Sequence, residues 1–181
     1  FEHTLSLRFH IHTEALLEGT FLAMENDEKT KIFLDGKTVE NRAEGWYVDH
    51  CIRKVPLPQM EAGEHELVVE IPYNSKVNIE AMFLLGEFSV KAVGRDQVLD
   101  AVSHKAAFSD LTAQGYPFYG GNMTYKIPFI SNGGEVNVRA NLFRAPVIKA
   151  AVDGKEAGYI AFSPYEVSLG ELPKGEHLLE L

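Results

Sequence analysis

The chain has very little cysteine, little basic charge and no long apolar run. Its 181 residues include one cysteine, and 17 Lys and Arg stand against 26 Asp and Glu, so the formal net charge is -9. A single cysteine excludes an internal disulfide and a cysteine-based zinc site, so packing alone must hold the fold. We expect Cys51 itself to be a small buried residue. The acidic surface has no basic cluster and repels phosphate backbones, which argues against a nucleic-acid partner.

No membrane segment is expected either. The longest apolar stretch, residues 81–85, is far shorter than the roughly 20 residues that cross a bilayer. The chain opens at Phe1 in a strand-like pattern without the features of a signal peptide, which favours an excised fragment and leaves the compartment open. With 45% hydrophobic residues, the chain can bury one generous core or two compact ones.

The sequence contains an internal repeat. Residues 31–37, with Asp35-Gly36 at their end, recur 118 positions later around Asp153-Gly154, and residues 63–69 recur 112 positions later as residues 175–181. The alternating run Leu5, Leu7, Phe9, Ile11 falls on Met123, Tyr125, Ile127, Phe129 at the first offset. Three ordered anchors separated by one six-residue deletion indicate a duplicated module.

Both copies carry the signals of β-strands. Apolar and polar residues alternate over residues 4–12, as in a strand with one face on a core. Each Asp-Gly pair sits between apolar segments, where it favours a type I′ hairpin turn. Glycine and proline recur about every ten residues, which is typical of sandwiches and jelly rolls. At most one short helix is expected, within residues 103–112.

These patterns predict an all-β chain of two jelly-roll-type antiparallel β-sandwich modules, residues 1–98 and residues 99–181. The first copy continues through residues 83–90, whereas the second stops at the counterpart of Val69, so we expect the second copy to be truncated at its C-terminus. A truncated copy exposes an unpaired sheet edge, which predicts dimer formation through that edge.

The second copy also resembles a known family. The run Val152-Asp153-Gly154-Lys155 followed by Gly158, the segment 163–167 and the stretch 172–181 with its Lys174-Gly175-Glu176 turn look like the galactose-binding-like β-sandwich of family 2-type glycoside hydrolases. The aromatic segment 111–121 resembles the lead-in to such a module in bacterial α-L-rhamnosidase-like enzymes. In this chain, His65 and His177 replace the asparagine that is common in the closing-strand motif, and no catalytic (β/α)₈ barrel is present.

The resemblance implies a fold and a carbohydrate-related context, without catalysis by this chain. The acidic residues occupy turn-like and alternating positions typical of solvated faces, so no catalytic residue is assigned. His10 and His12 share a strand face at metal-ligand spacing, but no third ligand is visible, so no metal and no cofactor is expected. The equivalent positions of His65 and His177 indicate a structural role, such as closing a turn.

Aromatic residues beside polar ones form the candidate sugar-binding set, because sugar rings stack on exposed aromatic faces while polar side chains orient their hydroxyls. The alternative is that these rings plug the sandwich or pack on a missing catalytic domain. The set comprises Trp46, Tyr47, Asp49, Gln114, Tyr116, Phe118, Tyr119 and Asn122, with Arg53 beside the first three.

The expected function is therefore a non-catalytic accessory region of a larger, bacterial-type glycoside hydrolase, which braces the catalytic domain or contributes to sugar binding. An independent carbohydrate-binding module that targets an enzyme to a glycan is the alternative. The expected partner is a carbohydrate or the catalytic domain of the parent chain.

Overall fold

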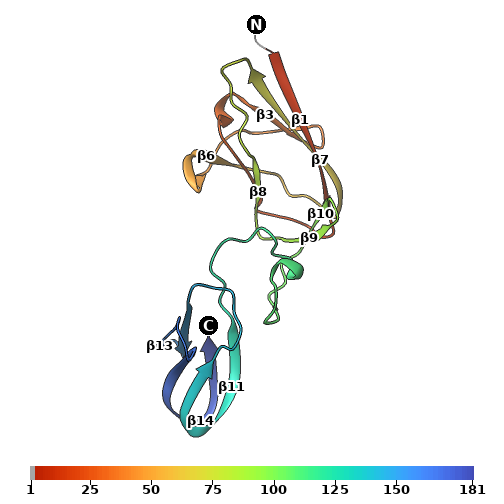
Figure 1. Ribbon diagram of the computed structural model, residues 1–181. Coiled ribbons are helices and arrows are strands. Elements are labelled where there is room, and N and C mark those ends of the chain that lie inside the picture. The colour runs from red at the N-terminus through yellow and green to blue at the C-terminus, as the bar shows by residue number, and fades with distance from the viewer. Residues whose placement is uncertain (1–2) are drawn as a thin grey trace. The chain divides into compact units, whose positions relative to one another are not determined.

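The computed structural model describes residues 3–181, and contacts divide the chain into two compact units, Phe1–Tyr119 and Gly120–Leu181 (Figure 1). The predicted all-β class is confirmed, since the only helical elements in the described part are two single 3₁₀ turns, η1 (Asp27–Lys29) and η2 (Thr112–Gln114). Within residues 103–112, where at most one short helix is expected, the only helical residue is Thr112, which begins the 3₁₀ turn η2.

The first unit contains two sheets. Its ten strands are β1 (His3–Thr13), β2 (Phe21–Met24), β3 (Lys31–Leu34), β4 (Lys37–Val39), β5 (Trp46–Tyr47), β6 (Asp49–Pro56), β7 (Gly63–Tyr73), β8 (Phe83–Leu85), β9 (Ser89–Val93) and β10 (Asp96–Asp100). The larger sheet has the order β4-β3-β7-β1-β10-β9, and the smaller one has the order β5-β6-β2-β8. All pairings are antiparallel except β1 with β10, which run parallel.

The core of this unit combines apolar side chains from both sheets. Ile32 and Val69 come from the larger sheet, Leu22 and Val55 come from the smaller one, and each is at most 2% exposed. The alternation predicted for β1 contributes only its partly buried Leu7 and Ile11 to this core. Burying one such aliphatic side chain stabilises the fold by about 1.5–3 kcal/mol, so contact between the two sheets holds the unit together.

The second unit contains one sheet. Its strands are β11 (Lys126–Arg139), β12 (Ile148–Val152), β13 (Lys155–Ile160) and β14 (Glu166–Glu180), in the order β11-β14-β12-β13. The buried core consists of Ala150, Val152, Leu169 and Leu179. Two strands approach unusually closely at Gly158, where an added Cβ would lie 2.9 Å from Val167 on β14.

The register of the strands supports the repeat. In the first unit Phe9 pairs with Leu67 and Ile11 with His65; in the second, Ile127 pairs with Leu179 and Phe129 with His177. These pairs differ by 118 positions on one strand and 112 on the other, the same two offsets that the sequence contains. The strand order β4-β3-β7-β1 recurs as β13-β12-β14-β11. The two sheets are therefore related strand by strand over this region.

Both predicted hairpin turns have the expected backbone geometry. Asp35 and Gly36 have φ of 52° and 73°, and Asp153 and Gly154 have φ of 51° and 76°. A type I′ turn requires positive φ at both central residues, which aspartate tolerates and glycine adopts freely. Each turn joins two antiparallel strands, β3 to β4 and β12 to β13.

The two units also differ. Within residues 120–181, no strand corresponds to β8, β9 or β10 of the first unit. The smaller sheet has no separate counterpart there either, because β11 and β14 pair along their full length, from Lys126 with Glu180 to Arg139 with Glu166. The second unit is thus built around one long hairpin and one short hairpin.

The segment that follows β10, residues 101–119, packs within the first unit. Gly115 accepts a hydrogen bond through its carbonyl from the Val90 amide on β9, at 2.8 Å. It lies so close to Ser89 that an added Cβ would be 2.8 Å from the serine Cβ, and its φ of +95° also favours glycine. The division of contacts therefore falls after Tyr119, later than the boundary predicted after residue 98.

Candidate functional site

The smaller sheet of the first unit carries an aromatic surface on one face. Directly paired residues in a sheet share a face, and Ala23 on β2 pairs with Lys54 on one side and Phe83 on the other. The Phe83 ring lies 5.4 Å from that of Tyr47, and the Lys54 ammonium lies 4.9 Å from the centre of the Phe21 ring. We call these four flanking residues, Phe21, Tyr47, Lys54 and Phe83, the aromatic face.

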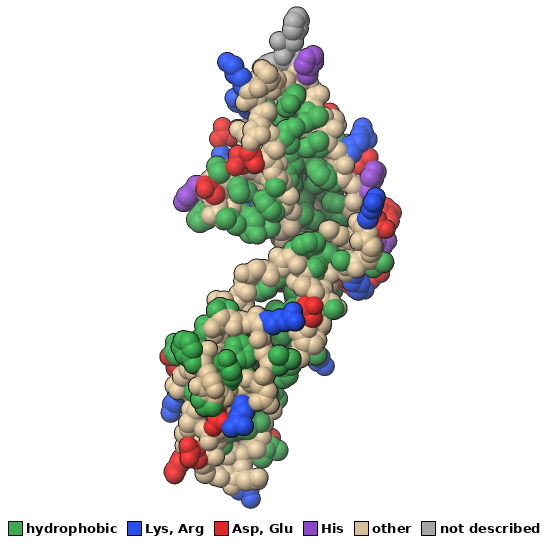
Figure 2. Space-filling view, in the orientation of Figure 1, with side chains coloured by type: hydrophobic (Ala, Val, Ile, Leu, Met, Phe, Trp, Pro, Cys, Tyr) green, Lys and Arg blue, Asp and Glu red, His purple; other side chains and the backbone are tan. Residues whose placement is uncertain are grey.

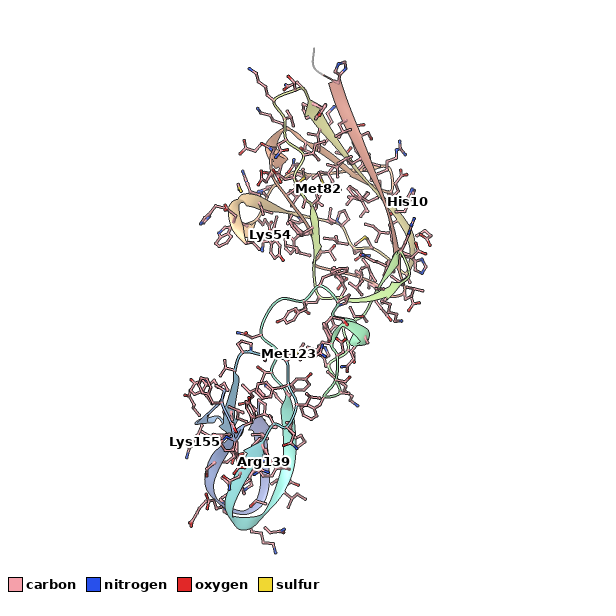
Figure 3. All side chains as sticks on the ribbon, in the orientation of Figure 1. His10, Lys54, Met82, Met123, Arg139 and Lys155 are labelled. Atoms are coloured by element: carbon pink, nitrogen blue, oxygen red, sulfur yellow. The ribbon has the colours of Figure 1, made fainter. Side chains whose placement is uncertain are left out.

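This face is open to solvent although its centre is covered. Tyr47 and Phe83 are each 36% exposed, whereas Ala23 between the larger side chains is fully buried. In Figure 2 apolar side chains gather on the visible side of the first unit, around the projecting end that carries β6 in Figure 1. Lys54, labelled in Figure 3, lies at this end. Partly exposed rings beside a cation can bind a ligand with a flat apolar surface and polar edges.

The β5–β6 hairpin adds a second ring pair at its tip. Trp46 is 48% exposed, and its ring centre lies 4.3 Å from that of His50. Between them, Val48 has a φ of 62° and is 76% exposed. A β-branched residue in the left-handed region is strained, so the tight turn holds its conformation against the preference of Val48.

Asp49 organises this tip. Its carboxylate accepts a hydrogen bond from the Cys51 amide at 3.1 Å, and that bond lowers the pKa of Asp49. The Cys51 thiol donates to Glu25 at 3.3 Å, and its hydrogen bonds with Glu25 and then Asp49 raise the pKa of the thiol to about 11. The expectation that Cys51 is buried is wrong: it is exposed, because β6 begins at the open hairpin tip.

Arg53 forms ion pairs with the acidic residues of η1. Its guanidinium donates to Glu28 at 2.8 Å and approaches the nearly buried carboxylate of Asp27 at 3.6 Å. On the sheet Arg53 pairs with Trp46, but its guanidinium is engaged by η1.

The second predicted aromatic cluster is a folded segment whose polar groups are largely occupied. Gln114 accepts from the Ala107 amide at 2.7 Å and donates to the Ala107 carbonyl, to Ser109 and to the Asp110 carbonyl. The Tyr116 hydroxyl donates to the Ser103 carbonyl at 2.6 Å. These bonds close residues 103–116 into a loop. The side chains of Gln114 and Tyr116 therefore hold this loop together.

The remaining predicted residues follow this loop. Phe118 and Tyr119 are 67% and 54% exposed, and the Tyr119 ring meets that of Tyr116 edge-on at 6.3 Å. Asn122 is exposed and belongs to the second unit. The predicted set is thus carried by two separate elements of the first unit and by the start of the second.

The two repeat histidines form identical structures. Asp35 binds His65 Nδ1 at 2.7 Å and accepts from the Glu66 amide at 2.9 Å, while His65 Nε2 lies 2.7 Å from the Glu61 carbonyl. The same four-part network recurs with Asp153, His177, Leu178 and Pro173, at 2.6, 2.9 and 3.0 Å. We call each network an Asp–His clasp. Both clasps tie a type I′ turn to the closing strand, so the predicted structural role is confirmed.

His10 and His12 on β1 lie on its polar face. His12 Nδ1 contacts Glu64 at 2.6 Å, and His10, labelled in Figure 3, lies on the side of the first unit opposite Lys54. Among residues 3–181, no three His, Cys, Asp or Glu side chains gather closely enough to hold a metal ion. In the same part of the chain, no helix has the length and apolar character needed to span a membrane.

Sequence reasoning missed three members of the aromatic face. Phe21, Lys54 and Phe83 join Tyr47 only through the register of β2, β6 and β8, which are far apart in sequence.

Comparisons with protein-family models, curated proteins and solved structures found no match to the chain.

Proposed function

We propose that the chain is a non-catalytic, carbohydrate-associated accessory region of a larger glycoside hydrolase, built from two related jelly-roll-type β-sandwich modules. The aromatic face is its sugar-contacting surface, and Trp46 precedes Tyr47 on the same short strand. The observation that carries this proposal is the gathering of Tyr47, Phe83, Phe21 and Lys54 on one exposed sheet face.

The chemistry of this surface suits a sugar ring. The flat C–H face of a pyranose packs on aromatic rings, and nearby polar side chains bind its hydroxyls. Lys54 supplies a donor on the face itself, and Asp49 supplies an acceptor at the hairpin tip. Neither Gln114 nor Tyr116 is included, because both serve the internal loop.

Fluorescence titration of the whole chain tests the proposal. Trp46 is the single tryptophan and directly precedes Tyr47 on β5, so its emission is the probe for sugar binding at this hairpin. Replacing Tyr47 or Phe83 by serine removes a ring contact worth about 0.5–1.5 kcal/mol, which weakens binding roughly 2- to 12-fold. Phe118→Ser is a matched control, since Phe118 is exposed but lies outside the surface.

Bracing of a catalytic domain is the second role, and a different observation favours it. Large apolar side chains are strongly exposed elsewhere, including Leu142 at 93%, Phe162 at 85% and Phe118 at 67%. Where such side chains gather into a patch, they mark surfaces that contact other proteins. If oligosaccharide titrations across plant and host glycans stay flat while the chain binds a glycosidase catalytic domain, the brace replaces the sugar-binding role.

An independent carbohydrate-binding module is the alternative function. It predicts sugar binding with the same Tyr47 and Phe83 dependence but no affinity for a catalytic domain. Measuring both bindings on one preparation separates the three roles.

A further inference from the structure

Lys54 gives the aromatic face a positive charge that no acidic side chain within residues 3–181 neutralises through an ion pair. The residue before it, Arg53, is paired with Asp27 and Glu28 instead. Neighbouring residues of a strand point to opposite faces of the sheet, and Arg53 pairs with the core residue Met24. Strand β6 therefore carries an ion-paired cation on its inner side and an unneutralised one on the aromatic face.

The neighbours of Lys54 on this face are uncharged. Ala23 pairs with it on β2, and its amide donates a hydrogen bond to the Gly45 carbonyl at 3.2 Å on the other side. Phe21 and Pro56 form the next pair that shares this face. An anionic group of a ligand can therefore approach Lys54 across an apolar surface.

The acidic residues that border the face leave Lys54 unpaired. The carboxylate of Glu25, which follows β2, accepts a hydrogen bond from the Cys51 thiol at 3.3 Å. Glu44 contacts Lys54 through its backbone, since its amide donates to the Lys54 carbonyl at 2.7 Å. Neither carboxylate competes with a ligand for the Lys54 ammonium through an ion pair.

The structure also holds the Lys54 side chain in place. Its stem passes close to Gly45, where an added Cβ would lie 3.5 Å from the lysine Cε, and the φ of +72° at Gly45 also favours glycine. Its ammonium lies 4.9 Å from the centre of the Phe21 ring. The lysine is half-buried, so its charge is positioned beside the rings before a ligand binds, which lowers the cost of ordering it.

A stacked sugar would direct one particular group toward this lysine. Stacking holds a pyranose by its C–H face, so the exocyclic carbon projects from the edge of the sugar ring and lies beside the aromatic rings. Phe83, Ala23 and Lys54 stand side by side on β8, β2 and β6, which separates the backbones of Phe83 and Lys54 by two strand spacings, roughly 10 Å. A sugar on Phe83 and Tyr47 thus reaches Lys54 with its edge.

The charge of that edge group decides how strongly Lys54 binds it. In a neutral hexose the exocyclic carbon carries a hydroxyl, whereas in a uronic acid it is a carboxylate. An ammonium group binds a carboxylate through a charge-assisted hydrogen bond, which is shorter and about twice as strong as a neutral one.

We propose that the aromatic face selects acidic sugars, with the ring of a uronic acid on Tyr47 and Phe83 and its carboxylate at Lys54. The inference rests on the proposed sugar-contacting role of this face and names the class of sugar. Lys54 is its specificity-determining residue, and neutral sugars bind the same rings more weakly.

Calorimetric titration of the whole chain with charged and neutralised forms of the same sugar tests the inference. The probes are trigalacturonate and a glucuronate-containing hyaluronan tetrasaccharide, each compared with its methyl ester, which keeps the rings and linkages but removes the carboxylate charge. At low salt we expect at least one acid form to bind about tenfold more tightly than its ester. Sodium chloride at about 0.5 M should reduce this difference, because it screens the ion pair.

Three variants locate the effect. Lys54→Gln should weaken binding of the acid form about tenfold and leave the ester unchanged, while Lys54→Arg should keep the preference because it keeps the charge. Lys31→Gln is the matched control: Lys31 is exposed on the larger sheet, so the net charge changes equally but the face does not. An unchanged unfolding midpoint of Lys54→Gln, followed by Trp46 emission, verifies that the hairpin stays folded.

The outcomes separate this inference from the function on which it rests. If acid and ester forms bind equally, or if Lys54→Gln has no more effect than Lys31→Gln, the preference for acidic sugars is overturned and the sugar-contacting role remains. If no charged or neutral glycan binds at all, both are overturned.

Discussion

Breaking one Asp–His clasp should destabilise the first unit by an amount that the structure allows us to work out. Asp35→Ala removes the hydrogen bond from the Glu66 amide and the bond to His65. The first is worth about 1 kcal/mol, and the second about 1.5 kcal/mol, at the low end because the aspartate is half exposed. Alanine at a φ of 52° costs about 1 kcal/mol more. We expect a total loss of about 3.5 kcal/mol.

Asp35→Asn separates these contributions. Asparagine tolerates the left-handed turn and still offers an oxygen to the Glu66 amide, so it loses mainly the charged bond to His65. The expected cost is about 1 kcal/mol. Chemical unfolding followed by the fluorescence of Trp46, which lies in the first unit, measures both variants. Asp153→Asn breaks the twin clasp and should move the Trp46 midpoint less than Asp35→Asn does.

The cost of Asp35→Asn should depend on pH. The hydrogen bond from His65 lowers the pKa of Asp35. Burial alone lowers the pKa of His65, but its bonds to the Glu61 carbonyl and to Asp35 raise it overall. The aspartate contribution is present above its unfolded pKa and is lost as pH falls through the lowered value. The histidine contribution is present below its unfolded pKa and is lost as pH rises through the raised value.

The difference between wild type and Asp35→Asn should therefore be largest between about pH 4 and pH 6.5, and smaller on either side. The same pH range applies to the second unit. There the hydrogen bond between Asp153 and His177 lowers the pKa of Asp153 and raises the pKa of His177. Two results would refute the reasoning. One is a stability difference between wild type and Asp35→Asn that stays constant from pH 3 to pH 8, and the other is an Asp35→Ala variant that is as stable as Asp35→Asn.

Three further predictions concern single positions. Val48→Gly should stabilise the first unit by about 0.5–1 kcal/mol in chemical unfolding, because the strained φ is relieved at the cost of chain entropy; an unchanged midpoint contradicts this. Cys51 should react slowly with a thiol reagent at pH 8 despite its exposure, and Glu25→Gln should speed the reaction by removing the main cause of its raised pKa. Gly115→Ala should loosen the loop against Ser89, so that limited proteolysis cuts within residues 103–116 faster than in wild type; equal cleavage rates would show that the contact is not needed.

The sequence was sufficient for the features that depend on local signals. Each Asp-Gly turn needs only two adjacent residues, and the match between His65 and His177 indicated a shared structural role before any contact was known. The strands of both units follow from alternation and from the spacing of glycine and proline.

The features that the sequence did not predict depend on register or on side-chain bonding. Phe21 and Phe83 meet Tyr47 and Lys54 only because β8, β2 and β6 pair at particular positions. Gln114 looks like a ligand-binding amide in the sequence, yet it bonds the backbone of its own loop.

The hydrogen bond between Val90 and Gly115 has a practical consequence for anyone who shortens the chain. β9 ends the larger sheet, and Gly115 occupies one of its outward-facing amides. A piece that stops near residue 98, where the first module is predicted to end, would leave this amide without its partner and also cut β10. Preparations of the first unit that extend to Tyr119 should therefore remain monodisperse, whereas shorter ones should aggregate.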